Sequence, residues 1–330
     1  TDMYSHGFFD ALSISFDIIA RRINRYRKEK SNFEDQIVFL AGKKLYNTYF
    51  KNYTKKFWGV SPKSLSSKWV PSRIIPRFAG NSALEKQWLC YPKKGGFEEI
   101  ANHYESEFLK HGGKITTNAS PEILIENNKI AGLSHDGIPH PYDHVISTIP
   151  LPELLKKLGR ETSIPYRSMI FVFIKTRKKR ILDTCSICFF PTSELTFTRI
   201  YEMNSYSSSN SPKRQSGIGL EIPVFDTSAI WHSNDELIYK KIESQLVSNG
   251  FLKVNDVVGY EVKRYRYAYP IPTIEYFDTT DNIRKQVGIE NLHLAGRNGL
   301  FEYYDVCQSL ESGDSVISSI ITSDKDSNKN

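Results

Sequence analysis

The chain has 330 residues, a formal net charge of +7 and a sequence pI of about 9.0. Its length exceeds the size at which one hydrophobic core keeps growing, so two packed domains are expected, and a hydrophobic content of 39% excludes an intrinsically disordered protein. Four cysteines are too few for a disulfide framework, which favours a cytoplasmic protein, and we expect neither a signal peptide nor an integral membrane segment.

Basic residues gather in three short runs, Arg21–Lys30, Lys51–Lys56 and Arg177–Arg180. Each run is short enough to be the solvated end of a helix or strand, and we prefer this interpretation to a nucleic-acid or lipid surface. The most lipophilic stretch, residues 8–23, is interrupted by charges, which favours a core helix over a helix on a membrane surface. We therefore expect no nucleic-acid partner.

Residues 6–90 are predicted to be mostly helical. A capping-box pattern at Ser31–Glu34 predicts a helix that extends through Tyr53, and Trp58 is expected to anchor a helix end in the core. Ser61–Ser64 breaks the chain before a further segment that ends at Arg77. A helix over Phe97–His111 then begins after a Gly-Gly turn and ends at another.

The rest of the chain is predicted to be rich in strands. We expect strands at Lys114–Thr117, Ile123–Ile125, Ile130–Ser134, His144–Pro150, Ile170–Thr176, Ser186–Phe190, Thr196–Tyr201, Gly219–Pro223 and Val257–Tyr267. The second and third should form a hairpin, and the three between residues 170 and 201 could share one antiparallel sheet. Helices are expected at Asn234–Asn249 and Thr280–Val287, a mobile polar loop at Ser205–Gln215, and a disordered tail after residue 322.

Cys185 and Cys188 have the C-x-x-C spacing of metal and redox sites. They fall in a run that predicts a strand, in which residues three apart face opposite sides, and no second ligand pair follows. His140 and His144 have H-x-x-x-H spacing, but Pro141 between them argues against the helix that would bring them together. We therefore expect no metal site.

The chemically informative segment is the turn between a strand at Asn291–Arg297 and a helix at Asp305–Ile321. Such a turn presents free backbone N–H groups and the positive end of a helix dipole. Gly296 and Gly299 would let a ligand approach the backbone, and Arg297 has a charge suited to phosphate. These residues predict an anion site, with a plain connection between strand and helix as the alternative.

Residues 294–313, Leu-Ala-Gly-Arg-Asn-Gly-Leu-Phe-Glu-Tyr-Tyr-Asp-Val-Cys-Gln-Ser-Leu-Glu-Ser-Gly, resemble the C-terminal flavin motif of the FAD-dependent amine-oxidase superfamily. That superfamily includes flavin-containing amine oxidases, protoporphyrinogen oxidases and UDP-galactopyranose mutases. Further segments resemble it in the same order, namely Asn32–Ile37, Phe50–Leu65, Tyr91–Phe97 and Val145–Pro150. The resemblance therefore implies FAD as the cofactor.

The resemblance also implies roles for individual residues. Gly296 and Arg297 would approach the FAD phosphates, and the backbone near Asp305 and Val306 would meet the edge of the isoalloxazine ring. The other cofactor-binding residues that it implies are Gly299, Ser120, Gly95 and Gly96. The substrate-binding residues that it implies are Arg199, Tyr269 and Tyr303. From the residues alone, Arg199 could instead be an exposed strand cation paired with Glu202, and the tyrosines could serve packing only.

The expected fold is α/β, with an incomplete Rossmann-like FAD-binding domain and a substrate domain made of a mixed sheet and helices. The chain contains no G-x-G-x-x-G fingerprint for the FAD pyrophosphate, so we expect that a βαβ unit is missing. The predicted parts are a helical part of the substrate domain (1–90), an FAD-domain segment (91–150), the substrate domain (151–287), the C-terminal FAD-domain segment (288–322) and the tail (323–330).

The resemblance implies three functions. The first is an FAD-dependent oxidoreductase that acts on a small amine, alcohol or unsaturated carbon, with the protein orienting the substrate and excluding water. The second is a UDP-galactopyranose mutase-like isomerase that acts on a nucleotide sugar for surface polysaccharide. Against it, Glu302 stands where the mutase carries an arginine, and a carboxylate disfavours a nearby diphosphate. The third is a non-catalytic protein that kept the fold and lost FAD.

Overall fold

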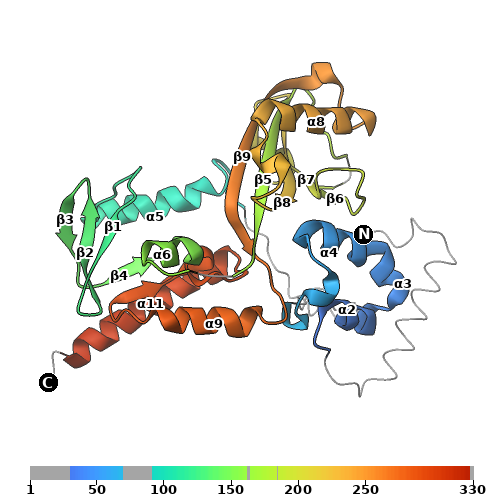
Figure 1. Cartoon of the computed structure of the whole chain (residues 1–330). Coiled ribbons are helices and arrows are strands. Elements are labelled where there is room, and N and C mark those ends of the chain that lie inside the picture. Colours follow the sequence, from blue (N-terminus) through green and yellow to red (C-terminus); the bar gives the residue numbers. More distant parts are fainter. Residues whose placement is uncertain (1–29, 70–90, 162–163, 184, 328–330) are drawn as a thin grey trace, which may run out of the picture. The chain divides into compact units, whose positions relative to one another are not determined.

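The computed structural model describes residues 30–69, 91–161, 164–183 and 185–327, and its fold is mixed α/β, as predicted (Figure 1). The chain forms two compact units. The first contains residues 1–114, 167–266 and 272–274, and the second contains residues 115–166, 267–271 and 275–330. The domain boundaries expected from the sequence remain a prediction.

The helical part of the first unit begins at Asn32, whose Oδ1 accepts a hydrogen bond of 2.9 Å from the Asp35 amide. The helix α2 (Phe33–Ala41) ends at Gly42, which has φ 88°, and the prediction of one helix through Tyr53 is therefore wrong. Three further helical elements follow, namely α3 (Lys43–Leu45), the π-helix η2 (Tyr46–Phe50) and α4 (Lys51–Trp58). The cause of this break is local. Gly42 adopts a positive φ that glycine tolerates and that L-residues disfavour.

The end of α4 is anchored as predicted. Trp58 is 1% exposed, and Gly59 ends the helix in the left-handed conformation with φ 71°. Trp69 packs edge-on against Trp58, with 5.0 Å between ring centroids, and also contacts Phe33. Two short 3₁₀ turns, η3 (Pro62–Ser64) and η4 (Ser67–Trp69), follow, and the remainder of the segment predicted up to Arg77 lies outside the described residues.

A five-stranded sheet forms the centre of the first unit (Figure 1). Its strand order is β6-β7-β8-β5-β9, with β5 at Tyr166–Thr176, β6 at Ile187–Phe189, β7 at Arg199–Glu202, β8 at Ser216–Val224 and β9 at Val257–Pro270. The β5–β8, β7–β8 and β6–β7 pairs are antiparallel. The prediction that the strands between residues 170 and 201 share one antiparallel sheet is confirmed, with β8 inserted between β5 and β7.

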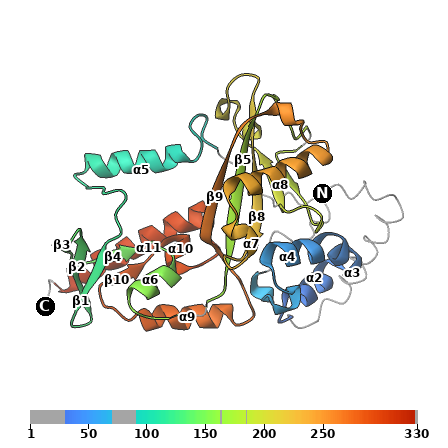
Figure 2. The same cartoon turned by 45° about the horizontal axis from the view of Figure 1, so that its top comes forward.

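One layer of helix packs on this sheet. The buried side chains of α8 (Asp235–Ser248), among them Ile238, Ile242 and Leu246, join the alternate buried residues of β5 and β8 in one hydrophobic core. In Figures 1 and 2, α8 lies along the sheet beside β5 and β9. The short elements α7 (Ala229–His232) and η8 (Val254–Asp256) flank α8 in the chain.

The helix α5 (Glu98–Lys110) lies close to its predicted place and follows Gly95 and Gly96, which have φ 72° and 70°. The strand predicted at Lys114–Thr117 is wrong, because these residues form no regular element. Ile115 is 45% exposed and the segment pairs with no described strand, so no strand hydrogen bonds hold it in an extended conformation.

The second unit contains two small sheets. The strands β1 (Glu122–Glu126), β2 (Lys129–His135) and β3 (Ile138–Pro141) form an antiparallel sheet, and β4 (Val145–Ser147) pairs in parallel with β10 (Leu292–Leu294). The predicted hairpin between β1 and β2 is confirmed. Asn127 and Asn128 form its turn with φ 48° and 62°, values that asparagine tolerates better than most residues.

Four helices accompany these strands, namely α6 (Leu151–Lys157), α9 (Tyr276–Val287), α10 (Gly296–Leu300) and α11 (Val306–Ser327). Figure 2 shows α6, α10 and α11 around β4 and β10. Leu151, Leu154, Val287 and Phe301 belong to the core of this unit. The helix α11 continues to Ser327, so the disorder predicted after residue 322 is wrong for residues 323–327, and residues 328–330 lie outside the described chain.

Cys185 and Cys188 meet, contrary to the sequence argument. β6 begins only at Ile187, so Cys185 precedes the strand and the two Sγ atoms lie 2.9 Å apart. Across the described residues, no group of three or more His, Cys, Asp or Glu side chains could hold a metal ion. No described helix is long and apolar enough to span a bilayer.

We expect Cys188 to alkylate more slowly than Cys307 at neutral pH. Burial and the Cys185 thiol raise the pKa of Cys188 to about 11, whereas Cys307 is exposed, and only the thiolate reacts. Timed iodoacetamide labelling followed by peptide mass spectrometry measures both rates in one sample. Equal rates at pH 7, or a Cys188 rate that does not rise with pH, would contradict this expectation.

Candidate functional site

The predicted flavin motif forms a strand, a short helix and a long helix in the second unit. β10 ends at Leu294 and α10 begins at Gly296, so the strand predicted through Arg297 is three residues too long. Gly296 has φ 73°, and a Cβ placed there would meet no heavy atom within 4 Å. Its N–H donates to Ser312 Oγ at 2.8 Å. The space beside Gly296 is therefore open, as a site for close ligand approach requires.

Gly299 has a packing role that the sequence did not reveal. A Cβ at this position would lie 2.4 Å from the carbonyl oxygen of Ser147 and 3.2 Å from the Cα of Thr148. Both atoms belong to the backbone at the end of β4, and Gly299 is itself buried. The glycine therefore allows α10 to pack on β4, and its contact with a ligand remains a prediction.

Arg297 is held between two aromatic rings and two carbonyl groups. Its guanidinium carbon lies 4.4 Å from the ring centroid of Tyr269 and 5.1 Å from that of Tyr303, and the two rings stack at 5.4 Å. The guanidinium also donates to the carbonyls of Tyr304 at 3.2 Å and Ala268 at 3.1 Å. The structure thus brings together a residue predicted to bind cofactor and two predicted to bind substrate, and cation–π contact stabilises the group.

The start of α11 has the features of an anion site. Asp305 and Gln308 form a reciprocal cap, in which each side chain accepts a hydrogen bond of 3.0 Å from the other residue's amide. The amides of Val306 and Cys307 have no acceptor within the described chain, and the Val306 side chain is 51% exposed. Two free N–H groups at the positive end of a 22-residue helix attract a negative or electron-rich group.

Glu302, which counted against a diphosphate ligand, forms an ion pair that the sequence did not reveal. Arg284 on α9 donates to Glu302 Oε1 at 2.7 Å and to the Leu300 carbonyl at 2.7 Å. The two side chains are 18% and 21% exposed, so solvent screens this pair only in part. Tyr276, whose pKa is raised chiefly by burial, donates to the carbonyl of Phe301. Arg284 also pairs with the exposed Asp281 at 2.9 Å, so it offsets part of the charge of Glu302.

The remaining predicted residues have contacts of their own or belong to the other unit. Ser120 accepts a hydrogen bond of 3.1 Å from Lys157. Gly95, Gly96 and Arg199 belong to the first unit. Arg199 forms an ion pair with Glu221 rather than with Glu202, so the pairing suggested from the sequence is wrong.

Glu202 is fully buried and has other partners. Its carboxylate accepts hydrogen bonds from the amides of Ile181 and Leu182 and from the Ser216 hydroxyl. A spacing of two or three residues along a strand cannot predict such partners, since they come from the neighbouring strand and loop.

Residues 48–245 match the family model described as UDP-galactopyranose mutase. The chain belongs to the UDP-galactopyranose mutase family. The chain is 27% identical over 136 residues to the dTDP-fucopyranose mutase of Escherichia coli, an alignment that covers 38% of this chain and 34% of that protein. It is 22% identical over 301 residues to a protein assigned as a UDP-galactopyranose mutase in Klebsiella pneumoniae, covering 88% of this chain and 62% of that one. The chain thus spans less than two thirds of either relative.

Solved structures share the fold of this mutase-family chain. A reduced UDP-galactopyranose mutase superposes with a TM-score of 0.71 at 18% identity, over 89% of this chain and 67% of the other. A proposed protoporphyrinogen oxidase from Exiguobacterium sp. also superposes with a TM-score of 0.71, at 15% identity, over 94% of this chain and 71% of the other. The predicted superfamily and fold class are confirmed.

Proposed function

We propose that the protein is an FAD-dependent isomerase that acts on a nucleotide sugar, as a mutase for surface polysaccharide. The observation that supports this most is the mutase family match over residues 48–245. The two curated relatives are named for UDP-galactopyranose and dTDP-fucopyranose, which are both nucleotide-linked sugars. The order of the first two functions expected from the sequence is thereby reversed.

The ion pair between Arg284 and Glu302 supports this reversal. The objection to a diphosphate ligand was the acid at position 302, where the resemblance led us to expect an arginine. Arg284 lies 2.7 Å from that carboxylate and also 2.9 Å from the Asp281 carboxylate, so it offsets part of the negative charge of Glu302. A diphosphate close to this segment would meet less negative charge than the sequence alone indicates.

The described residues fit FAD. Gly296 offers an open approach, and the free amides of Val306 and Cys307 suit a phosphate or the electron-rich edge of a ring. Gly296, Arg297, Asp305 and Val306 would hold the cofactor, which when bound supplies redox and nucleophilic chemistry at its isoalloxazine ring. Asp305 would orient the start of α11 through its cap, and the stacked rings of Tyr269 and Tyr303 would keep water from the neighbouring Arg297.

We expect Arg297→Ala to weaken FAD retention by about tenfold, since it removes a charge-assisted contact and lets the two tyrosine rings separate. Fluorescence titration of the apoprotein with FAD measures the affinity. Arg297→Lys should lie between the variant and the parent, because lysine keeps the charge and cannot bridge two carbonyls in the same way. Lys285→Ala, an exposed position on α9, serves as the control. Unchanged retention in Arg297→Ala would refute the role of Arg297.

The function is tested with the protein in its complete natural length, because this chain covers 62% or less of its curated relatives. Conversion between the pyranose and furanose forms of UDP-galactose and dTDP-fucose is followed by chromatography with the flavin chemically reduced. Turnover of either nucleotide sugar under reducing conditions is the expected result. A protein that binds FAD and turns over neither sugar in either direction would overturn the proposal.

An oxidoreductase is the second candidate, favoured by the equal TM-score of 0.71 with the proposed protoporphyrinogen oxidase. The same fold serves both isomerases and oxidoreductases, so the fold by itself does not decide between them. Bleaching of the visible flavin spectrum by an amine, alcohol or unsaturated substrate without added reductant would select the oxidoreductase. A protein with no flavin spectrum even after FAD is added would select the non-catalytic alternative.

A further inference from the structure

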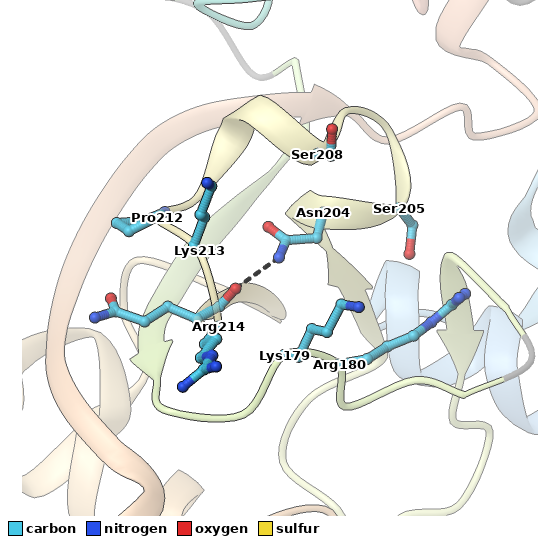
Figure 3. A pocket seen from close by; sticks show the side chains of 9 residues that line it. Lys179, Arg180, Asn204, Ser205, Ser208, Pro212, Lys213 and Arg214 are labelled. Atoms are coloured by element: carbon cyan, nitrogen blue, oxygen red, sulfur yellow. Dashed lines mark hydrogen bonds between the residues drawn. The ribbon is translucent and has the colours of Figure 1, made fainter.

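The first unit contains a cavity of about 730 Å³ at one end of its sheet (Figure 3). It lies between the residues that follow β5 and the connection from β7 to β8. The residues of its lining that matter here are Lys179, Arg180, Asn204, Ser205, Lys213 and Arg214. None of them belongs to the predicted flavin or substrate residues. The volume is in the range of small-molecule sites.

Among the described residues of the lining, four side chains are cationic and none is a carboxylate. Lys179, Lys213 and Arg214 form no ion pair with any described residue. Arg180 is 3.9 Å from Glu202 Oε2, but that buried acid already accepts hydrogen bonds from two amides and a hydroxyl. Four like charges in one hollow raise the local concentration of anions. The cavity therefore favours a negatively charged ligand.

The basic run at residues 177–180 is divided between two roles. Arg177 donates to the Asn255 carbonyl at 3.0 Å and Lys178 to the Phe251 carbonyl at 3.2 Å, so both hold the chain around η8. Lys179 and Arg180 line the cavity instead, and Figure 3 shows both side chains extending to the side where Ser205 lies. Arg177, Lys179 and Arg180 are exposed and Lys178 is half-buried, so the run lies at the solvated end of β5, as predicted.

The wall opposite this run has its own anchors. The hydroxyl of Ser207 donates to the Lys93 carbonyl at 2.7 Å. The amide of Asn210, in the 3₁₀ turn η7 (Ser208–Asn210), donates to Tyr91 Oη at 3.1 Å and to the Met203 carbonyl at 3.0 Å. These contacts give the β7–β8 connection a defined shape, so the cavity exists before a ligand arrives. The mobility predicted for this loop remains a prediction.

Two buried polar atoms in the lining have no partner. Asn204 donates from Nδ2 to the Gln215 carbonyl at 2.7 Å (Figure 3), which leaves its Oδ1 as a buried acceptor without a donor. The Ser205 hydroxyl oxygen is also buried and unbonded. Such atoms are rare in folded proteins, because each has lost its hydrogen bonds to water. A ligand that satisfies both atoms needs a hydroxyl group that donates to Asn204 Oδ1 and an anionic group that accepts from the Ser205 hydroxyl.

We propose that this cavity binds a phosphorylated sugar. The phosphate would lie among Lys179, Lys213 and Arg214, with the Ser205 hydroxyl donating to a phosphate oxygen. A sugar hydroxyl would donate to Asn204 Oδ1. Inorganic phosphate satisfies the cations and the Ser205 hydroxyl but leaves Asn204 Oδ1 without a sugar hydroxyl, and a neutral sugar satisfies only Asn204 Oδ1. Binding does not depend on flavin, so the site goes beyond the proposed mutase activity.

The test is calorimetric titration of the purified full-length protein, without reductant, with galactose 1-phosphate, inorganic phosphate and galactose. Galactose 1-phosphate should bind tightest, and the double variant Lys179→Gln with Lys213→Gln should weaken it by about tenfold. The exposed Lys175 on β5 is outside the lining, and Lys175→Gln should leave the affinity unchanged. UDP-galactose is titrated into the parent and the double variant, and a loss of its affinity as large as that for galactose 1-phosphate would identify nucleotide sugar, rather than free sugar phosphate, as the source.

Ser205→Ala is the second variant, because its hydroxyl has no partner and its removal breaks no hydrogen bond in the fold. We expect it to keep the melting temperature and to weaken galactose 1-phosphate by about fivefold. Unchanged affinity in both variants would overturn the proposal, as would equal affinity for inorganic phosphate and the sugar phosphate. Preferential binding of single-stranded DNA, lost in the double lysine variant, would replace it with a polyanion surface. Because no turnover is measured, failure of the mutase assay leaves the outcome unaffected.

Discussion

Replacing Gly299 with alanine is expected to lower the free energy of unfolding by about 2 to 3 kcal/mol. The new Cβ would lie 2.4 Å from the Ser147 carbonyl oxygen, which already accepts a hydrogen bond of 3.1 Å from the Ala295 amide. Neither atom can move freely, because Ser147 is paired with Leu294 in the parallel sheet. Relief of the overlap must therefore separate α10 from β4. Urea titration followed by circular dichroism measures the change.

Gly313→Ala provides the matched control. Gly313 lies inside α11, and a Cβ there would meet no heavy atom within 4 Å. Alanine at such a helical position should stabilise the protein by about 0.5 to 1 kcal/mol. Opposite signs for the same chemical change at the two glycines are the expected result. Equal effects would show that packing on β4 is not the reason for glycine at position 299.

Lys56→Ala is expected to lower the free energy of unfolding by about 3 kcal/mol. The ammonium group of Lys56, on α4, donates to the carbonyls of Phe190 at 3.1 Å, Thr192 at 2.8 Å and Phe197 at 2.5 Å. Removing it leaves three carbonyls without this donor and releases α4 from the loop between β6 and β7. Thermal and urea unfolding measure the loss. Its neighbour Lys55 is exposed, so Lys55→Ala should change stability by less than about 0.5 kcal/mol.

Lys56 also makes the free energy of unfolding depend on pH. Burial lowers the pKa of Lys56 to about 8, from 10.5 for an ordinary lysine. Between these two values the unfolded chain binds more protons at this lysine than the folded chain does, so the contribution of Lys56 to stability rises with pH across that window. The difference in unfolding free energy between the parent and Lys56→Met, measured at pH 7, 8, 9 and 10, should therefore increase. A difference that falls with pH would show that the three carbonyls keep the ammonium charged.

The sequence predicts those parts of the fold that local contacts decide. The hairpin at Asn127 and Asn128 needs only two residues that accept positive φ, and the helix end at Gly59 needs only one. The start of α2 was misplaced by a single residue, since Ser31 and Asn32 are both good caps and only the geometry selects Asn32. The flavin motif was recognisable because its residues are contiguous.

Contacts between distant residues could not be predicted. Arg284 and Glu302 come from different helices, and no spacing rule joins them. The same holds for Lys179 and Lys213, which meet only because β5 and β8 are paired. Gly299 was assigned to a ligand because sequence does not distinguish close approach of a cofactor from close approach of β4. Site residues that depend on packing therefore require the structure.

The second unit is discontinuous, and this sets the order in which the protein folds during synthesis. β4 pairs with β10, and Asn291 donates to the Ile130 carbonyl, so strands made early wait for partners made near the end of the chain. Pairing across so long a separation is slow. The sheet of the first unit is complete once β9 has left the ribosome. It can therefore form while Val145 and its neighbours still lack β10, and the edge of β4 stays unpaired until β10 has been made.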